Sequence, residues 1–151
     1  MANGDLSRWE APLSIVDTLK RLSNVNGGTL MKYMLLVHHN EEVFAKFSET
    51  KQRQMLEESV QLTHQLHADG KYLSAAPLHQ ASTAAIVRVR DGKSSVTDGP
   101  FIETREQIAG YFLIHAKDLD DAIGIATQVP GARIGTVEVR PVKEISGLPA
   151  E

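Results

Sequence analysis

The sequence contains no cysteine. This absence excludes a thiol nucleophile, disulfide bonds and thiolate-ligated metal sites, and it is compatible with a reducing cytoplasm. The chain also has no apolar run long enough to span a bilayer, and its N-terminus lacks the continuous apolar core of a signal peptide. We therefore expect a soluble, cytoplasmic protein with no membrane partner.

Positive charge is not concentrated in any part of the chain. The 16 Lys and Arg residues are scattered, and with 19 Asp and Glu residues the formal net charge is -3. Nucleic acid is not an expected partner, because binding phosphates needs clustered basic residues. GxGxxG, Walker and GxSxG motifs are absent as well, so nucleotide binding and serine hydrolase chemistry lack their usual signatures. No cofactor is predicted.

What the chain does have is the length and composition of one globular domain. Its 151 residues are 42% hydrophobic and 23% charged, which is enough to bury a two-layer core without a disulfide or a structural metal. The residue pattern of the sequence changes near Met31, where an apolar, strand-like run begins. We predict a domain over residues 31–145, an N-terminal extension over 1–30 and a short tail over 146–151.

The N-terminal extension has two interpretations. Helical spacing of its apolar residues indicates a short docking helix; these residues are Leu6, Trp9, Leu13, Val16 and Leu19. Alternatively, the segment Asn-Gly-Gly-Thr-Leu just before Met31 could be the translation of a ribosome-binding site. Residues 1–30 would then be an artefact of the assigned start site.

Local patterns predict the elements of the domain in order. Strands are expected at 32–39, 72–78, 109–116 and 135–142, and helices at 48–69 and about 119–129. Ser48 and Asp118 are suitable N-caps, and Pro130 ends the second helix. Between the second and third of these strands, Asp91-Gly92 has the turn chemistry of a hairpin.

This order predicts an α+β fold of ferredoxin-like type, an antiparallel sheet with both helices on one face. The other face would stay open and serve as a dimer face or a ligand cleft. Alternation along the strands favours display on that face of four charged side chains, namely Arg88, Arg90, Glu138 and Arg140.

The segment TDGPF at 97–101 combines several turn formers. Asp98 can bond to its own backbone, Gly99 and Pro100 shape the turn, and Phe101 can pack back into the core. A purely structural role explains all of this. A turn does not explain the Glu103, Arg105, Glu106 and Tyr111 that follow, which could line a cleft edge and hold a polar or anionic ligand. The alternative is a solvated loop with a largely buried Tyr111.

Two adjacent histidines end the first strand. His38 and His39 must point to opposite faces, so only one can face a cleft. There it could act as a general acid or base near neutral pH, oriented by Asp98 or Glu138. The alternative is a polar strand end, and the sequence does not choose between the two residues. His64 and His67 have metal-compatible spacing on a helix, but no third ligand is indicated, and no metal site is predicted.

From Met31 to about Glu144 the chain resembles the YCII-related, DGPF-type domain proteins. The resemblance is carried by MKYMLLVHH, LHADG, YLSAAPL, VTDGPFIETREQIAGYFLI and PGARIGTVEVRPV, in collinear order. It implies a fold of the dimeric α+β barrel superfamily, and hence a homodimer. It also implies two roles seen among relatives, small-molecule enzymes and modules linked to extracytoplasmic-function sigma factors. A proposed catalytic His and Asp pair of YCII-type relatives corresponds to Ser59 and Val129 here.

We therefore expect a protein that binds a small polar or anionic metabolite, with activity of isomerase or lyase type through histidine acid/base chemistry. The alternative is a non-catalytic regulatory module linked to a sigma factor. Candidate catalytic residues are His38, His39 and Asp98, and candidate ligand-binding residues are Arg88, Pro100, Phe101, Glu103, Arg105, Tyr111 and Arg140.

Overall fold

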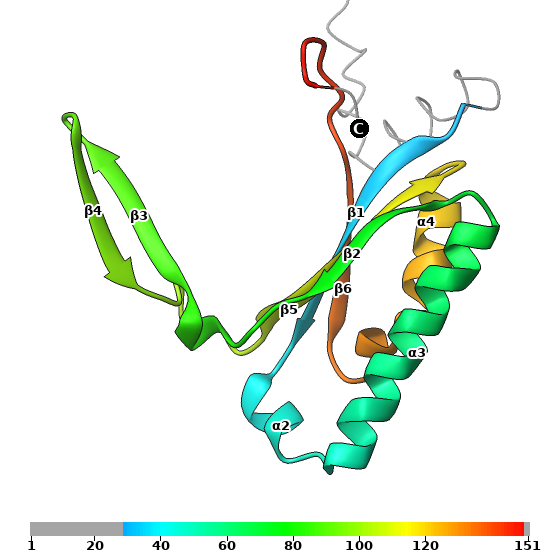
Figure 1. The fold of residues 1–151 in the computed structure, drawn as a ribbon, viewed down its shortest axis with the longest axis horizontal. Coiled ribbons are helices and arrows are strands. Elements are labelled where there is room, and N and C mark those ends of the chain that lie inside the picture. The colour runs from blue at the N-terminus through cyan, green and yellow to red at the C-terminus, as the bar shows by residue number, and fades with distance from the viewer. Residues whose placement is uncertain (1–28, 150–151) are drawn as a thin grey trace, which may run out of the picture.

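A computed structural model describes residues 29–149 of the chain, and Figure 1 shows the arrangement of its elements. Both interpretations of the N-terminal extension concern residues that lie almost entirely outside this range. The elements are β1 (Met31–His39), α2 (Glu41–Ala45), α3 (Glu49–Ala68), β2 (Tyr72–Pro77), η1 (Ala81–Thr83), β3 (Ala85–Arg90), β4 (Lys93–Asp98), β5 (Gln107–Ala116), α4 (Leu119–Ala126), η2 (Pro130–Arg133) and β6 (Thr136–Pro141).

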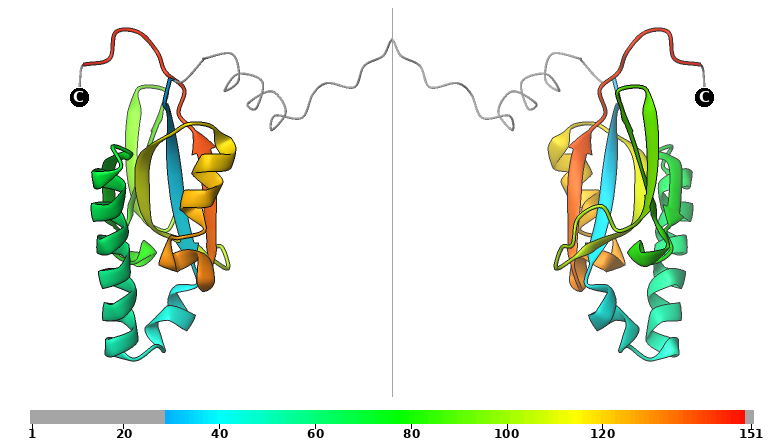
Figure 2. Two further views of the ribbon diagram at one scale, coloured as in Figure 1. Left: turned by 90° about the vertical axis from the view of Figure 1, so that its right-hand side faces the viewer. Right: turned by 90° about the vertical axis from the view of Figure 1, so that its left-hand side faces the viewer.

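The main sheet has four antiparallel strands in the order β2-β5-β1-β6. Helices α3 and α4 cover one face of this sheet, and no helix of the described chain covers the other (Figures 1 and 2). This arrangement confirms the predicted α+β, ferredoxin-like fold with both helices on one face. No helix in the described residues combines the length and apolar character needed to span a membrane.

Period-two alternation along the central strands builds the core. On β1, Tyr33, Leu35 and Val37 are buried and face the helices, while the residues between them face the open side. Phe112 and Ile114 do the same on β5. The helices contribute Leu62, Leu66, Ala122 and Ile125 to the same cluster. Both alternating sets of β1 contain apolar residues, and the set with Tyr33, Leu35 and Val37 is the one that packs against the helices.

The predicted helix starts are confirmed by their caps. The Ser48 side chain accepts a hydrogen bond from the Lys51 amide (3.2 Å), and the Asp118 side chain accepts one from the Asp121 amide (2.8 Å). Helix α4 ends at Ala126 rather than at 129 as predicted. The reason is Pro130, which excludes helical geometry from the preceding residue, and Val129 is accordingly extended.

The hairpin predicted at Asp91-Gly92 is present, with positive φ angles of 51° and 73° at those two residues. Its placement differs from the prediction. Strands β3 and β4 pair only with each other and form a separate two-stranded sheet, which projects away from the main sheet in Figure 1. The expectation that Arg88 and Arg90 share the open face with Glu138 and Arg140 is therefore wrong. Alternation assigns a residue to a face of its own ribbon, and it does not say which sheet the ribbon joins.

Candidate functional site

A cleft of about 290 Å³ lies between α3 and the part of the sheet formed by β2 and β5. One wall is the apolar side of α3, with Met55, Leu56 and Val60. The opposite wall is the sheet, including Ala75 and Phe112. The volume lies just below the usual range of small-molecule sites, about 300–1,000 Å³, and such sites are commonly concave and mainly apolar.

Glycine allows close packing at two places around the cleft, between the neighbouring strands β2 and β5 of the sheet wall and between η2 and β1. A Cβ atom at Gly110 of β5 would lie 2.7 Å from the carbonyl oxygen of Ala76 on β2, and one at Gly131 would lie 2.4 Å from a methyl group of Val37. Real Cβ atoms do not approach backbone oxygen so closely. The cleft shape in this region therefore depends on the absence of these two side chains.

The cleft contains very little formal charge. Among the described Asp, Glu, Lys, Arg and His residues, only His39 lines it. Other polar side chains on its surface are Gln52, Ser59, Thr63 and Tyr72. A buried ion without a partner is costly, so this lining favours a neutral ligand.

The end of β1 and the start of α2 position His39. The Asn40 side chain accepts a hydrogen bond from the Val43 amide (3.0 Å) and so begins helix α2 directly after the strand. This turn brings the ring of Phe44 parallel to the His39 ring, with centroids 4.5 Å apart and planes 14° apart. Helix α2 was not predicted from the sequence, because its five residues are too few to show a helical period.

Gln52 of α3 fixes the segment that carries Phe44. Its side-chain nitrogen donates to the carbonyl oxygens of Phe44 (3.2 Å) and Phe47 (3.0 Å). The Lys51 ammonium lies 3.6 Å from the centroid of the Phe47 ring, a cation–π contact. The histidine at the cleft is therefore held by an aromatic residue that is itself bonded to α3.

The pKa of His39 is lowered from its usual value of 6.5, mainly because burial disfavours the imidazolium, while Glu41 and Glu106 oppose the shift. Neutral imidazole is thus the dominant form at pH 7. A neutral imidazole nitrogen can accept a proton or a hydrogen bond, which is the requirement for a general base.

We expect the His39 ring to titrate below pH 6.5 in the folded protein. The unfolded chain then binds more protons than the folded chain as pH falls through 6.5, so this group lowers stability progressively below that pH and contributes no loss above it. The measurement is an NMR titration of the ring C–H resonances, with the signal assigned by its disappearance in His39→Gln. A midpoint at or above 6.5 would contradict the proposed burial of the ring.

His38 lies on the opposite, open face of the sheet and does not line the cleft. Its Nε2 is 3.7 Å from a carboxylate oxygen of Glu138, and that carboxylate also accepts a hydrogen bond from Nε of Arg140 (2.9 Å). The three side chains form a small polar group on the outer face. Of the two adjacent histidines, the structure places His39 at the cleft, and its catalytic role stays a prediction.

Most other candidate site residues lie away from the cleft. Asp98, Pro100, Glu103 and Arg105 are exposed and belong to the end of β4 or the loop after it. Arg88 and Phe101 contact each other, with the guanidinium 5.3 Å from the ring centroid. Of the ligand-binding candidates, Tyr111 alone is among the residues that border the cleft, through its backbone. Its side chain lies on the open face, opposite Leu36 in the register, and its hydroxyl hydrogen-bonds there with that of Ser74 (3.1 Å).

The DGPF turn has a visible structural role. The Gly99 amide donates to the Ala84 carbonyl oxygen (2.6 Å), and a Cβ atom at Gly99 would lie 2.6 Å from the Ala84 Cβ. Gly99 therefore closes the base of the β3–β4 hairpin. The expected packing of Phe101 into the core is wrong, since 64% of this residue is exposed. The loop follows the separate β3–β4 hairpin, and the Phe101 ring lies against the Arg88 guanidinium.

Sequence reasoning did not identify most of the cleft wall, including Phe44 and Gln52. The resemblance did give a partial signal, because Ser59 and Val129, the positions of the proposed catalytic pair in relatives, both line this cleft. The Ser59 hydroxyl donates to the Met55 carbonyl oxygen of its own helix (2.9 Å), and Val129 is almost fully buried. In residues 29–149 no three His, Asp or Glu side chains are grouped as a metal site.

Two comparisons with known proteins agree. The family model of the YCII-related domain matches residues 31–146. A protein of Rhizobium meliloti (strain 1021), described as uncharacterized, is 32% identical over 114 residues, which cover 74% of this chain and 92% of that protein. The matched region includes every element described above.

Proposed function

The chain belongs to the YCII-related domain family, and from this premise we propose that it binds a small, neutral, mainly apolar molecule in the cleft between α3 and the sheet. The observation that carries the proposal is the lining: an apolar cleft of about 290 Å³ with His39 as its only charged or basic residue among those described. An apolar pocket with a few polar groups that fix orientation is typical of a small-molecule site.

The lining also argues against an anionic ligand in this cleft. The cationic candidates Arg88, Arg105 and Arg140 do not line it, so a carboxylate or phosphate would lose hydration there without gaining a cationic partner. We therefore propose a neutral, mainly apolar ligand in place of the polar or anionic one that the sequence favoured.

We further propose that His39 serves as a proton acceptor in chemistry of isomerase or lyase type. The neutral imidazole can take a proton from one carbon of a bound substrate and, in an isomerisation, return it to another, so no co-reactant is consumed. The lowered pKa of His39 supports this role because the acceptor form is then present at neutral pH.

The binding proposal can be tested with a matched pair of probes at pH 7.5, 2-naphthol and 2-naphthoate, followed by NMR. We expect 2-naphthol to shift the signals of Phe44 and Met55 and to bind at least about tenfold more tightly than the carboxylate, because no cation faces the cleft. His39→Gln should weaken naphthol binding by about fivefold, the value of one hydrogen bond.

His38→Gln is the control, since it changes the adjacent residue on the other face of the sheet. Its naphthol affinity should equal that of the wild type. Equal affinity of the two probes, or equal effects of the two substitutions, would show that the cleft assignment is wrong.

We also propose a homodimer through the open face of the sheet. Met34, Leu36 and Leu113 lie on that face between the buried residues of β1 and β5, and each is only half-buried in the single chain. A row of apolar residues on an uncovered sheet face is the kind of surface that a second molecule covers.

A further inference from the structure

The hairpin formed by β3 and β4, here called the arm (residues 85–98), has two unlike faces. Alternation places Val87, Val89 and Val96 on one face, and Val87 is directly opposite Val96 in the register. The other face carries Arg88, Arg90 and Lys93. Ser94 and Asp98 also lie on the first face and Ile86 on the second, but the three valines make the first face the more apolar one. This pattern is typical of a strand pair with one face buried and one face in solvent.

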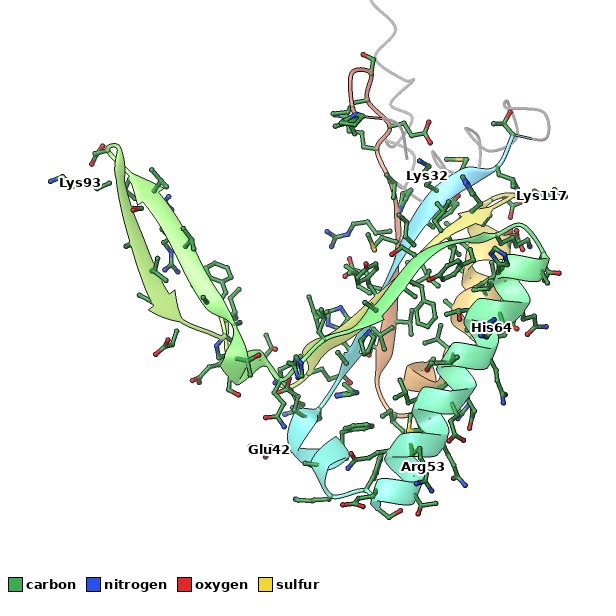
Figure 3. The ribbon with its side chains drawn as sticks, in the orientation of Figure 1. Lys32, Glu42, Arg53, His64, Lys93 and Lys117 are labelled. Atoms are coloured by element: carbon green, nitrogen blue, oxygen red, sulfur yellow. The ribbon has the colours of Figure 1, made fainter. Side chains whose placement is uncertain are left out.

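The apolar face of the arm is uncovered in the single chain. The exposed fractions are 63% for Val87, 58% for Val89 and 67% for Val96. Figures 1 and 3 show the arm extending from the body, with Lys93 at its tip far from the side chains of α3. An isolated two-stranded hairpin is marginally stable in water, and an apolar surface of this kind marks an interaction site.

The base of the arm is fixed to the body, so the arm has a defined direction. The Ala81 amide donates to a carboxylate oxygen of Glu41 (2.8 Å), and the Glu41 amide donates to the side chain of Gln107 (3.1 Å). These bonds join η1, α2 and the start of β5. Figure 1 shows that the arm leaves the sheet on the side opposite α3 and α4, the same side as the open face.

We propose that the arm clasps a second copy of this chain, with its apolar face packed on a partner docked against the open face. This inference rests on the proposed homodimer and adds the arm to its interface. A molecule on the open face lies beside the arm, because both are on one side of the sheet. Two-fold symmetry makes the contact reciprocal, so both uncovered apolar surfaces are buried without a different protein.

The combined area of the open sheet face and the arm supports a second copy of the chain as the partner. A four-stranded face with strands about 4.8 Å apart and six residues of about 3.3 Å each covers roughly 400 Å². A stable interface commonly buries about 800 Å² per partner. The two strands of one arm add roughly 200 Å² by the same spacing, and each molecule both gives an arm and receives one. The two arms therefore provide about half of the interface area per partner, which is the part that the sheet face alone does not provide.

The test replaces the arm valines by threonine, which is also β-branched and keeps the strand propensity. We expect Val87→Thr/Val89→Thr/Val96→Thr to weaken dimerisation in sedimentation equilibrium by about 100-fold, because six buried apolar side chains per dimer are lost. The matched control, Arg90→Thr/Lys93→Thr/Ser95→Thr, changes three exposed residues of the same two strands on the other face. Its dimer affinity should stay within about threefold of the wild type, since exposed charges contribute little.

A second measurement locates the arm directly. The chain has no cysteine, so Val96→Cys carries a single benzophenone label, and mixing isotope-labelled with unlabelled protein distinguishes contacts between molecules. We expect cross-links from the arm of one molecule to peptides of the other. Cross-links confined to the same molecule, or formed in cells with a sigma factor instead of a second copy, would overturn the proposal.

The outcomes distinguish a failure of the proposed homodimer from a failure of the proposed role of the arm. A wild-type protein that stays monomeric at high concentration contradicts the homodimer and the arm together. A dimer that the threonine variant leaves unchanged contradicts only the role of the arm. Naphthol binding in the cleft is measured independently on the same variants and is expected to persist in all of them.

Discussion

Gly135→Ala is expected to destabilise the domain by about 3 kcal/mol, the upper part of the usual cost of overpacking. A Cβ atom at Gly135 would lie 2.0 Å from the carbonyl oxygen of His38 and 3.0 Å from the Cα of His39. Both neighbours are backbone atoms of β1, so no side-chain rotation can relieve the contact. The strand end must move, and the cleft histidine moves with it.

Thermal unfolding is the first measurement, and we expect a decrease in Tm of roughly 10 °C for a domain of this size. Gly124→Ala is the matched control. Gly124 lies within α4, is exposed, and has no atom within 4 Å of an added Cβ, so alanine should stabilise the helix by about 0.5–1 kcal/mol. The same Gly→Ala substitution is thus expected to lower Tm at position 135 and to raise it at position 124. A Tm shift in the same direction for both variants would refute the assigned contact.

Ser59→Trp is expected to abolish naphthol binding, with a loss of affinity of more than about 100-fold, because the indole ring occupies the space of the ligand. Ser59 lies on α3 and lines the cleft. Its hydroxyl donates to the Met55 carbonyl oxygen within the same helix (2.9 Å). The fold should therefore tolerate the change, with a stability cost near 1 kcal/mol.

Gln61→Trp provides the control for helix α3, since Gln61 is exposed and does not line the cleft. Both variants add the same side chain to the same helix. We expect wild-type naphthol affinity for Gln61→Trp and none measurable for Ser59→Trp, as read by isothermal titration calorimetry. If Ser59→Trp folds and still binds with wild-type affinity, the ligand site lies elsewhere.

The two adjacent histidines show what strand alternation can predict and what it cannot. Alternation correctly requires His38 and His39 to face opposite sides of β1. It does not say which side carries α3, because that depends on which residues of β5 and the helices pack against Tyr33, Leu35 and Val37. Only the assembled layers place His39 against Phe44 and give its imidazole a lowered pKa.

The charged candidate residues, in contrast to His39, do not line the cleft. Glu103 and Arg105 were predicted as ligand-binding residues because they follow the DGPF turn in sequence, and Arg88 because strand alternation put it on the open face. In the structure this segment forms and follows the arm, outside the cleft lining. The apolar wall from α3 was not predicted to be part of a site, because a stripe of apolar residues on a helix usually packs into the core.

The sequence alone determined the positions of the long helix and the four sheet strands, the turn at Asp91-Gly92, the ferredoxin-like order and the family resemblance. These properties depend on side-chain periodicity, caps and turn residues that act over a few neighbouring positions. The tertiary structure decided that the β3–β4 hairpin leaves the main sheet, that His39 faces a cleft, and that α3, β2 and β5 enclose it. These depend on which distant segments pair and pack, and residues such as Gly110 and Gly135 allow that packing through contacts far away in the chain.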